Sequence, residues 1–249
     1  MEWKGQVRDT LFQLLTAEEK SYLEECEKTI ADNYSTSFVR IFSSLSRKLN
    51  SSKDNLLSIV QSEDNPLIVE NWTVLRLARV YLLSLIQDQQ EPYFSFIEKL
   101  FLYADMQELV ALYSALNIYE FPRIWVERCK EGIRNNIGPV QEAIMEQNKY
   151  PALYLNEEAW NQLVLKSFFT GKDINKIYGL YDRNNINLAN SIVDYIYERD
   201  SAKREINPML WELAKDHLPA RAVEILMQQS KSSPELLEKI KNRQECAQN

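Results

Sequence analysis

The sequence predicts an all-α protein built from roughly a dozen helices with short connections. Glycine is scarce, with 5 residues in a chain of 249, and proline is limited to 8. A β-sheet needs many tight turns, which are rich in these two residues, so their low numbers favour long helices. Apolar residues recur at helical spacing along most of the chain, and no alternating pattern is long enough to predict a strand.

The elements of the N-terminal half are predicted from capping signals and apolar spacing. Residues 2–15 have the pattern of a short amphipathic helix, and the capping box from Thr16 to Glu19 begins the next one. Pro66 marks a break in the chain, and Pro122 and Pro139 suit the first turns of two helices. The further helices expected in this half are 34–49, 53–61, 70–87, 91–104, 105–117, 122–135 and 138–148.

A short linker is expected at residues 149–151, between an N-terminal half, 1–150, and a C-terminal half, 151–249. The two halves are expected to form one continuous domain. Gly171 is placed to end the first helix after the linker, and the expected N-caps of later helices are Asn187, Asn207 and Ser233. The helices expected in this half are 156–170, 187–203, 207–217, 219–230 and 233–246.

Many helices with short connections favour antiparallel helix pairs stacked as an irregular, HEAT-like α-solenoid. The sequence has no clean internal period, so any repeats have diverged. An irregular globular helical domain is the alternative architecture.

Charge and composition exclude several classes of function. The net charge is −7 and the isoelectric point is about 5.0, which disfavours binding to nucleic acid or to anionic lipid. The N-terminus is too charged for a signal peptide, and the most apolar stretch, 72–86, is interrupted by Arg76 and Arg79. Cys26, Cys129 and Cys246 lack metal or redox spacing. We therefore expect a cytoplasmic protein with reduced thiols and no direct membrane insertion.

The sequence carries no recognisable catalytic or cofactor motif. His217 is the single histidine, which excludes paired-histidine metal sites, and its place before Leu218 and Pro219 suits a helix C-terminus. No phosphate-binding glycine loop, dinucleotide fingerprint or nucleophile elbow is present. Acid–base chemistry by carboxylates, lysine or tyrosine stays open, because such residues need only meet in the fold.

Two arginines lie on an otherwise apolar helix. Arg76 and Arg79 share a stripe with Trp72 and Leu83, and a buried guanidinium needs an anionic or carbonyl partner. One interpretation is an internal ion pair with a neighbouring helix. The other is an anion-binding site at a groove.

The C-terminal half has polar residues within apolar helices. On helix 156–170, Trp160, Leu163, Val164 and Phe168 form one apolar stripe, and Leu165 and Phe169 form a second, so this helix is expected to be buried on two sides. Asn161 lies on the second stripe and must be hydrogen-bonded. On helix 187–203, Leu188, Ile192 and Ile196 are expected in the core.

The other face of helix 187–203 carries Asn187, Ser191, either Asp194 or Tyr195, and Glu198. Asp194 and Glu198 are one turn apart, so they repel unless a cation from Lys166, Arg183 or Arg199 lies between them. We expect these side chains to converge on one side of the helices that carry them, either as a structural network or as the rim of a ligand-binding concavity: Lys166, Arg183, Asp194, Tyr195, Glu198 and Arg199. The candidate binding residues are Trp160, Asn161, Lys166, Arg183, Asp194, Tyr195, Glu198, Arg199, Arg76 and Arg79.

Residues 151–213 resemble the C-terminal half of the EboA family. The resemblance rests on an ordered set: Leu155 to Lys166 (Leu-Asn-Glu-Glu-Ala-Trp-Asn-Gln-Leu-Val-Leu-Lys), Ile177 to Leu180, Arg183, Asn184, Leu188, Ala189, Asp194, Tyr195, Glu198, Arg199, Pro208, Leu210 and Trp211. Residues 173–176 are more polar here than in the family pattern, and the N-terminal half is similar only in length and helicity.

The resemblance implies a cytosolic all-helical protein of metabolite traffic. Its implied setting is a bacterial gene cluster that includes a membrane prenyltransferase-like protein and that moves a prenylated or aromatic precursor across the inner membrane. The resemblance supplies no catalytic residue and no cofactor.

Three functions follow as hypotheses. A non-catalytic binding or adaptor protein would use a concave helical face for a protein partner or a hydrophobic small molecule. An enzyme would use Asp182, Asp194, Glu198 or Tyr195 on a hydrophobic substrate, although the paired aspartate motifs of helical prenyl-transfer enzymes are absent. A purely structural scaffold is the third.

Overall fold

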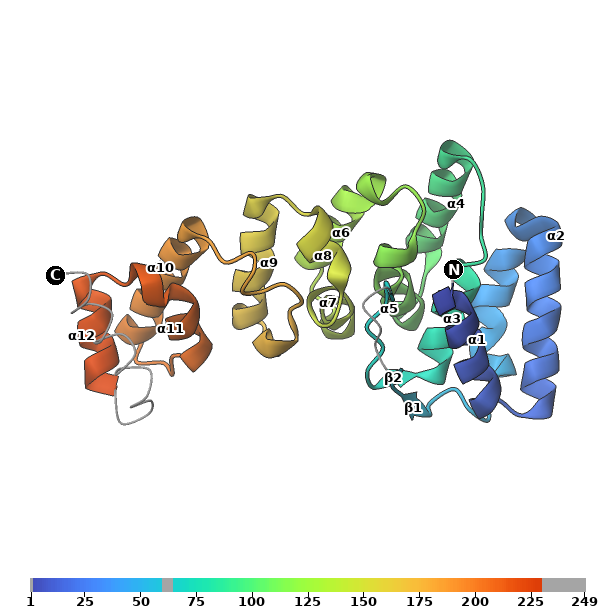
Figure 1. Ribbon diagram of the computed structural model, residues 1–249, viewed down its shortest axis with the longest axis horizontal. Coiled ribbons are helices and arrows are strands. Elements are labelled where there is room, and N and C mark those ends of the chain that lie inside the picture. Colours follow the sequence, from blue (N-terminus) through green and yellow to red (C-terminus); the bar gives the residue numbers. More distant parts are fainter. Residues whose placement is uncertain (1, 60–64, 230–249) are drawn as a thin grey trace. The chain divides into compact units, whose positions relative to one another are not determined.

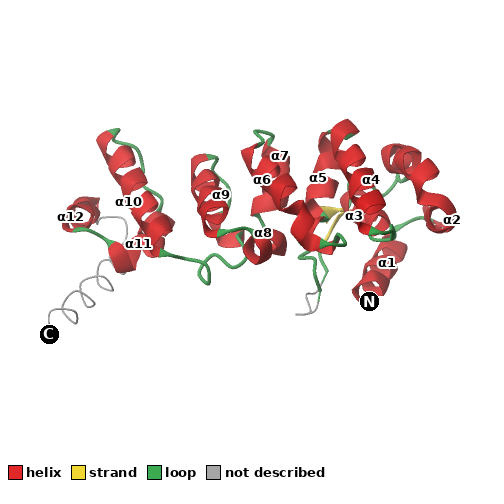
Figure 2. Cartoon of the chain, turned by 90° about the horizontal axis from the view of Figure 1, so that it is seen from above, coloured by secondary structure: helices red, strands yellow, loops and turns green. Residues whose placement is uncertain are grey.

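The computed structural model describes residues 2–59 and 65–229, and within them the chain is all-α as predicted (Figure 1). Figure 2 shows that helices form nearly all of the regular structure, with one short pair of strands. The α-helices are α1 (Glu2–Leu14), α2 (Ala17–Lys48), α3 (Val74–Leu83), α4 (Gln90–Tyr103), α5 (Met106–Ser114), α6 (Val126–Arg134), α7 (Gly138–Met145), α8 (Lys149–Tyr154), α9 (Glu157–Phe169), α10 (Ile186–Ser201), α11 (Pro208–Ala214) and α12 (Ala220–Gln229).

The chain divides into two compact units. The N-terminal unit comprises residues 1–159 and 176–178, and the C-terminal unit comprises residues 160–175 and 179–249. Short 3₁₀ segments complete the helices: η1 (Leu116–Ile118), η2 (Pro122–Trp125), η3 (Ile174–Lys176) and η4 (Lys215–His217). The solenoid arrangement and the division at residue 150 stay predictions, and the predicted helix 233–246 lies outside the described residues.

Helix α2 consists of two helical halves that fold into a hairpin at Asn33. Thr16 caps it as predicted, because the Thr16 hydroxyl accepts from the Glu19 N–H and the Glu19 carboxylate accepts from the Thr16 N–H. Asn33 has non-helical angles, φ −161° and ψ 89°, and bends the chain back. Tyr22 and Ser44, which lie equally far from Asn33 along the chain, meet with their hydroxyl oxygens 3.3 Å apart. The two halves of α2 therefore run antiparallel, in agreement with the separate helix predicted at 34–49.

The predicted helix at 53–61 is wrong. Residues 53–59 form turns and β1 (Leu56–Leu57), which pairs antiparallel with β2 (Trp72–Thr73). The backbone N–H of Ile59 donates to the Val69 carbonyl at 3.0 Å, so backbone groups of this stretch are satisfied across the pair and not within a helix. Because Trp72 and Thr73 belong to this strand pair, α3 begins at Val74 and not near residue 70 as predicted.

Helix α3 is the centre of the N-terminal unit. It packs against α1, α2 and α5, and all of its residues except Arg76 are buried. Arg79 is 2% exposed and pairs with the Glu108 carboxylate of α5 at 3.8 Å. The ion-pair interpretation is therefore confirmed for Arg79.

The predicted linker at 149–151 is wrong, because these residues begin α8. Asn148 explains this: its side-chain oxygen accepts from the Tyr150 N–H, and its amide donates to the carbonyls of Tyr113 and Ala143 at 3.1 and 2.9 Å. The buried Tyr150 donates its hydroxyl to the Pro122 carbonyl at 2.6 Å. Sequence reading took the Tyr–Pro pair as a break, whereas proline at an early helical position permits a helix start.

Helix α10 forms the core of the C-terminal unit with α11 and α12. Leu188, Ile192 and Ile196 are fully buried, as predicted. The helix begins earlier than expected, because Asn185 and not Asn187 is the N-cap: its side-chain oxygen accepts from the Leu188 N–H at 2.9 Å.

The prediction that α9 is buried on two sides is only half right. Its first stripe is buried at Trp160, Leu163 and Val164. On the second stripe Phe169 is 58% exposed. Over the described residues no helix has the length and apolar character needed to cross a bilayer, and no group of three or more His, Cys, Asp or Glu side chains is placed to hold a metal.

Candidate ligand pocket

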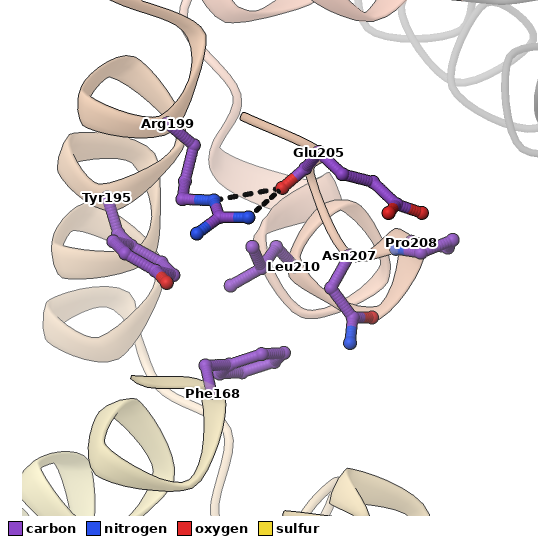
Figure 3. A pocket seen from close by; sticks show the side chains of 7 residues that line it. All are labelled: Phe168, Tyr195, Arg199, Glu205, Asn207, Pro208 and Leu210. Carbon is purple, nitrogen blue, oxygen red and sulfur yellow. Dashed lines mark hydrogen bonds between the residues drawn. The ribbon is translucent and has the colours of Figure 1, made fainter. Parts of the chain in front are cut away.

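A pocket of about 280 Å³ lies within the C-terminal unit (Figure 3). It is lined by residues of α9, of α10 and of the segment that enters α11: Phe168, Tyr195, Arg199, Glu205, Asn207, Pro208 and Leu210. Two of the ten predicted binding residues, Tyr195 and Arg199, lie in this lining. We call this set the aromatic pocket.

The position of Arg199 is fixed by the turn after α10. Its Nε and Nη2 atoms donate to the backbone carbonyl of Glu205 at 2.9 and 2.5 Å. The Glu205 carboxylate points away from the guanidinium, so the charge of Arg199 is not neutralised by this neighbour (Figure 3). Lys203, with φ 52°, provides the left-handed turn that brings Glu205 back beside the helix. The two hydrogen bonds to the Glu205 carbonyl therefore fix the Arg199 guanidinium at the wall of the pocket.

The aromatic wall comes from two helices. Phe168 is half-buried on α9, and Tyr195 is half-buried on α10. The Tyr195 ring also meets Phe169 edge-to-face, with centroids 4.6 Å apart, and the Arg199 guanidinium lies 5.9 Å from the Tyr195 ring centroid. These contacts orient the Tyr195 ring. Among the described residues the Tyr195 hydroxyl has no hydrogen-bond partner.

The remaining wall is the start of α11, which the sequence predicts well. Asn207 is the N-cap, its side-chain oxygen accepts from the Met209 N–H at 2.9 Å, and Pro208 occupies the first helical position. The cap leaves the Asn207 amide NH₂ facing the pocket beside the buried Leu210 (Figure 3). The pocket thus combines two rings and an apolar floor with a cation, a phenol and an amide donor.

The burial and pairing predicted for Asn161 are confirmed. Asn161 is 9% exposed, and its amide and that of Asn185 exchange two hydrogen bonds, of 3.2 and 2.9 Å. Since Asn185 also caps α10, this pair ties α9 to the start of α10. Asn161 does not line the aromatic pocket.

Trp160, Arg183 and Lys166 lie elsewhere in the C-terminal unit. The Arg183 guanidinium lies 4.8 Å from the ring centroid of the buried Trp160. The Trp160 indole N–H is buried with no hydrogen-bond partner among the described residues. Lys166 is half-buried on α9, and it is not among the residues that line the pocket.

Asp194 and Glu198 are exposed on α10. Within the described part of the chain no cation lies within 4.0 Å of either carboxylate, so the cation expected between them is not there. The set that we predicted to converge thus divides: Tyr195 and Arg199 lie together at the pocket, whereas Asp194, Glu198, Lys166 and Arg183 are not among its lining residues.

Arg76 belongs to the N-terminal unit. Its guanidinium lies 4.0 Å from the Trp72 ring centroid, and its Nε donates to the Ser114 hydroxyl at 2.9 Å. Burial lowers the pKa of Arg76, and the charge of Glu142 acts in the opposite direction. The groove beside Arg76 has room for about 10 Å³, which is the space of a single water molecule. Arg76 is therefore held by an aromatic ring and a hydroxyl and not by an ion pair.

The sequence did not indicate Phe168, Glu205, Asn207, Pro208 or Leu210 as site residues. It identified Asn207 and Pro208 as a helix start and Phe168 as part of an apolar stripe. The missing signal was the turn at Lys203, which brings the start of α11 beside Arg199. No pattern in the sequence predicts that Lys203 adopts a positive φ.

One comparison with known proteins finds a match. The family described as "Metabolite traffic protein EboA" matches residues 4–215. The match therefore also covers the N-terminal half, where the sequence reading found similarity only in length and helicity. No curated protein and no solved structure was found to match the chain.

Proposed function

The chain belongs to the EboA family, whose role is metabolite traffic, and on this basis we propose that it is a non-catalytic binding or adaptor protein. It holds an aromatic or prenylated metabolite precursor in the cytoplasm and passes it to a protein partner for transfer to or across the inner membrane. The observation that carries this proposal is the aromatic pocket, which has the lining of a binding site and no recognisable catalytic set.

The size of the pocket favours one aromatic ring. At about 280 Å³ it lies just below the range of roughly 300–1,000 Å³ that is usual for small-molecule sites. Phe168 and Tyr195 offer ring faces and edges for stacking, and Leu210 offers apolar contact. A prenyl tail on such a ring would extend out of the pocket.

The polar groups favour an anionic substituent on that ring. The Arg199 guanidinium carries five N–H donors and retains one terminal nitrogen, Nη1, without a partner among the described residues. The Tyr195 hydroxyl and the Asn207 amide add two neutral donors. A carboxylate accepts from all three, so an aromatic carboxylic acid is the ligand class that this lining suits best.

The membrane step would go through a partner. The chain carries a net charge of −7, which opposes direct contact with an anionic bilayer. A membrane prenyltransferase-like protein of the same gene cluster is the partner that the family setting suggests. An enzyme that acts through Tyr195 is the competing function, and it would require turnover of the bound ligand.

Affinity purification from the native host, with mass spectrometry of proteins and of small molecules, tests the proposal. We expect an aromatic acid to co-purify unchanged with the wild-type chain and to be lost from Arg199→Lys, which keeps the charge but removes the planar fork. Arg204→Lys is the matched control, because Arg204 is an exposed arginine of the same unit outside the pocket lining. Equal recovery from both variants, or recovery of a converted product, would contradict a non-catalytic site at Arg199.

A further inference from the structure

A second and larger pocket, of about 450 Å³, lies in the N-terminal unit between the two antiparallel halves of α2. One wall is the first half of α2, with Tyr22, Glu25 and Thr29, and the other is the second half, with Arg40, Ser44 and Arg47. We call it the hairpin groove. Its volume is within the usual range for a small-molecule site.

The hairpin groove concentrates positive charge in an acidic protein. Arg40, Arg47 and Lys48 all lie on the second half of α2, and Glu25 is the single carboxylate of the lining. No carboxylate of the described residues lies within 4.0 Å of Arg40 or Arg47, whereas Lys48 lies over the Tyr22 ring, 5.4 Å from its centroid. The lining therefore has three cations and one anion, although the chain as a whole has a net charge of −7.

The floor of the hairpin groove adds no negative charge. It includes Ile41 and the buried Cys26. Burial raises the pKa of the Cys26 thiol above its usual 9.0, so the thiol is neutral at pH 7. Burial likewise raises the pKa of the Tyr22 phenol above 10.0. Glu25 is thus the one group of the lining that opposes an anion.

The cations are spread along the groove and not gathered at one point. Arg40 and Arg47 are seven residues apart on one helix, which corresponds to about 10 Å along its axis. Guanidinium groups bind phosphate oxygens in pairs of parallel hydrogen bonds, and the Tyr22 and Ser44 hydroxyls can accept or donate beside them. The apolar floor suits an organic portion of the ligand.

We propose that the hairpin groove is a binding site for a phosphorylated small organic molecule, held through Arg40, Arg47 and Lys48. The site is separate from the aromatic pocket and does not depend on the function proposed for it. Glu25 limits the affinity of the site for the phosphate group.

Calorimetric titration with inorganic pyrophosphate and with phenyl phosphate tests this site. We expect saturable binding to the wild-type protein, with phenyl phosphate gaining from the apolar floor. Arg40→Gln combined with Arg47→Gln should weaken binding by about tenfold or more, because charge-assisted hydrogen bonds are lost. Arg123→Gln combined with Arg134→Gln is the control, since it makes the same change in net charge at exposed arginines of the same unit. It should change binding by less than about twofold.

Glu25→Gln gives a test in the opposite direction. Removal of this carboxylate should tighten pyrophosphate binding by roughly threefold or more. Circular dichroism checks that each variant is folded, which we expect because Glu25, Arg40 and Arg47 are exposed.

Three results would overturn the proposal. The first is no saturable binding of either probe up to about 10 mM, and the second is equal weakening in the variant and control pairs. The third is binding only to vesicles that contain phosphatidic acid, since it would make the groove a lipid-headgroup contact and not a small-molecule site.

Discussion

Asn161→Leu removes the buried amide that joins α9 to the cap of α10. The native amide makes two hydrogen bonds with Asn185, of 3.2 and 2.9 Å, at a position that is 9% exposed. Each such bond contributes about 0.5–1.5 kcal/mol. Leucine has nearly the same shape, so the change introduces little cavity and reports mainly on the lost bonds.

The hydrogen bonds that Asn185 keeps limit how far Asn161→Leu lowers the free energy of unfolding. In the variant the Asn185 oxygen keeps its bond from the Leu188 N–H, and the Asn185 amide keeps its bond to the Arg183 carbonyl at 3.1 Å. No buried group is left wholly unpaired, so we expect a loss of about 1–3 kcal/mol in the free energy of unfolding and not more. For a chain of this size that corresponds to a fall in Tm of about 2–12 °C.

Urea denaturation followed by far-UV circular dichroism measures this loss. Asn190→Leu is the matched control, because Asn190 is an exposed asparagine of α10, and it should stay within about 0.5 kcal/mol of the wild type. A double-mutant cycle with Asn185→Ala should give a coupling of at least about 0.5 kcal/mol. If Asn161→Leu is as stable as the control, or the coupling is zero, the amide pair does not hold these helices together.

Three further predictions concern other parts of the chain. Gly132→Ala places a methyl group against the Ile144 Cδ1 and 2.5 Å from the Tyr113 ring, so thermal melting should show a loss of about 1–3 kcal/mol. Burial would raise the pKa of Glu19, but hydrogen bonds from Thr16, Ser52 and Ser51 leave it below its usual 4.5. A group with a lowered folded pKa stabilises the fold above the unfolded pKa, so this contribution should be complete above about pH 4.5 and be lost as the pH falls further, and acid titrations of Glu19→Gln should lack that component. Burial raises the pKa of the Cys129 thiol. In a background with Cys26→Ser and Cys246→Ser, a thiol reagent should therefore modify Cys129 only at the rate of unfolding, and rapid labelling of the native protein would show that Cys129 is accessible.

Helix starts were predicted correctly where a short sequence motif alone determines them. The capping box at Thr16 and the asparagine–proline start at Asn207 are each encoded within four residues, and both are found where predicted. The N-cap of α10 was misplaced by two residues, because Asn184, Asn185 and Asn187 are all acceptable caps. Which of them is used depends on the pairing of Asn185 with Asn161, a contact between distant residues.

The strand pair, the burial of each helix face and the pocket lining depend on contacts between residues far apart in the sequence. Leu56 and Leu57 form a strand only because Trp72 and Thr73 lie beside them, so helical spacing at 53–61 misled the reading. The two stripes of α9 look alike in sequence, yet Trp160 is buried and Phe169 is exposed. Likewise, the sequence predicted four candidate site residues on α10, namely Asp194, Tyr195, Glu198 and Arg199. Only the turn at Lys203 selects Tyr195 and Arg199 for the aromatic pocket.

Binding of an aromatic acid to wild-type protein and to Arg199→Lys, with Tm measured on the same samples, tests the central claim most directly. Phenylacetate is the probe, and hexanoate, an aliphatic acid of equal charge, is the comparison ligand. We predict that the wild type prefers phenylacetate, that Arg199→Lys weakens its binding by about tenfold, and that Tm falls by no more than about 3 °C, because the partly exposed hydrogen bonds of Arg199 to Glu205 contribute little to stability. Equal binding of the two acids, or a loss of binding that merely follows a large fall in Tm, would contradict a ligand site at Arg199 and leave it a structural residue.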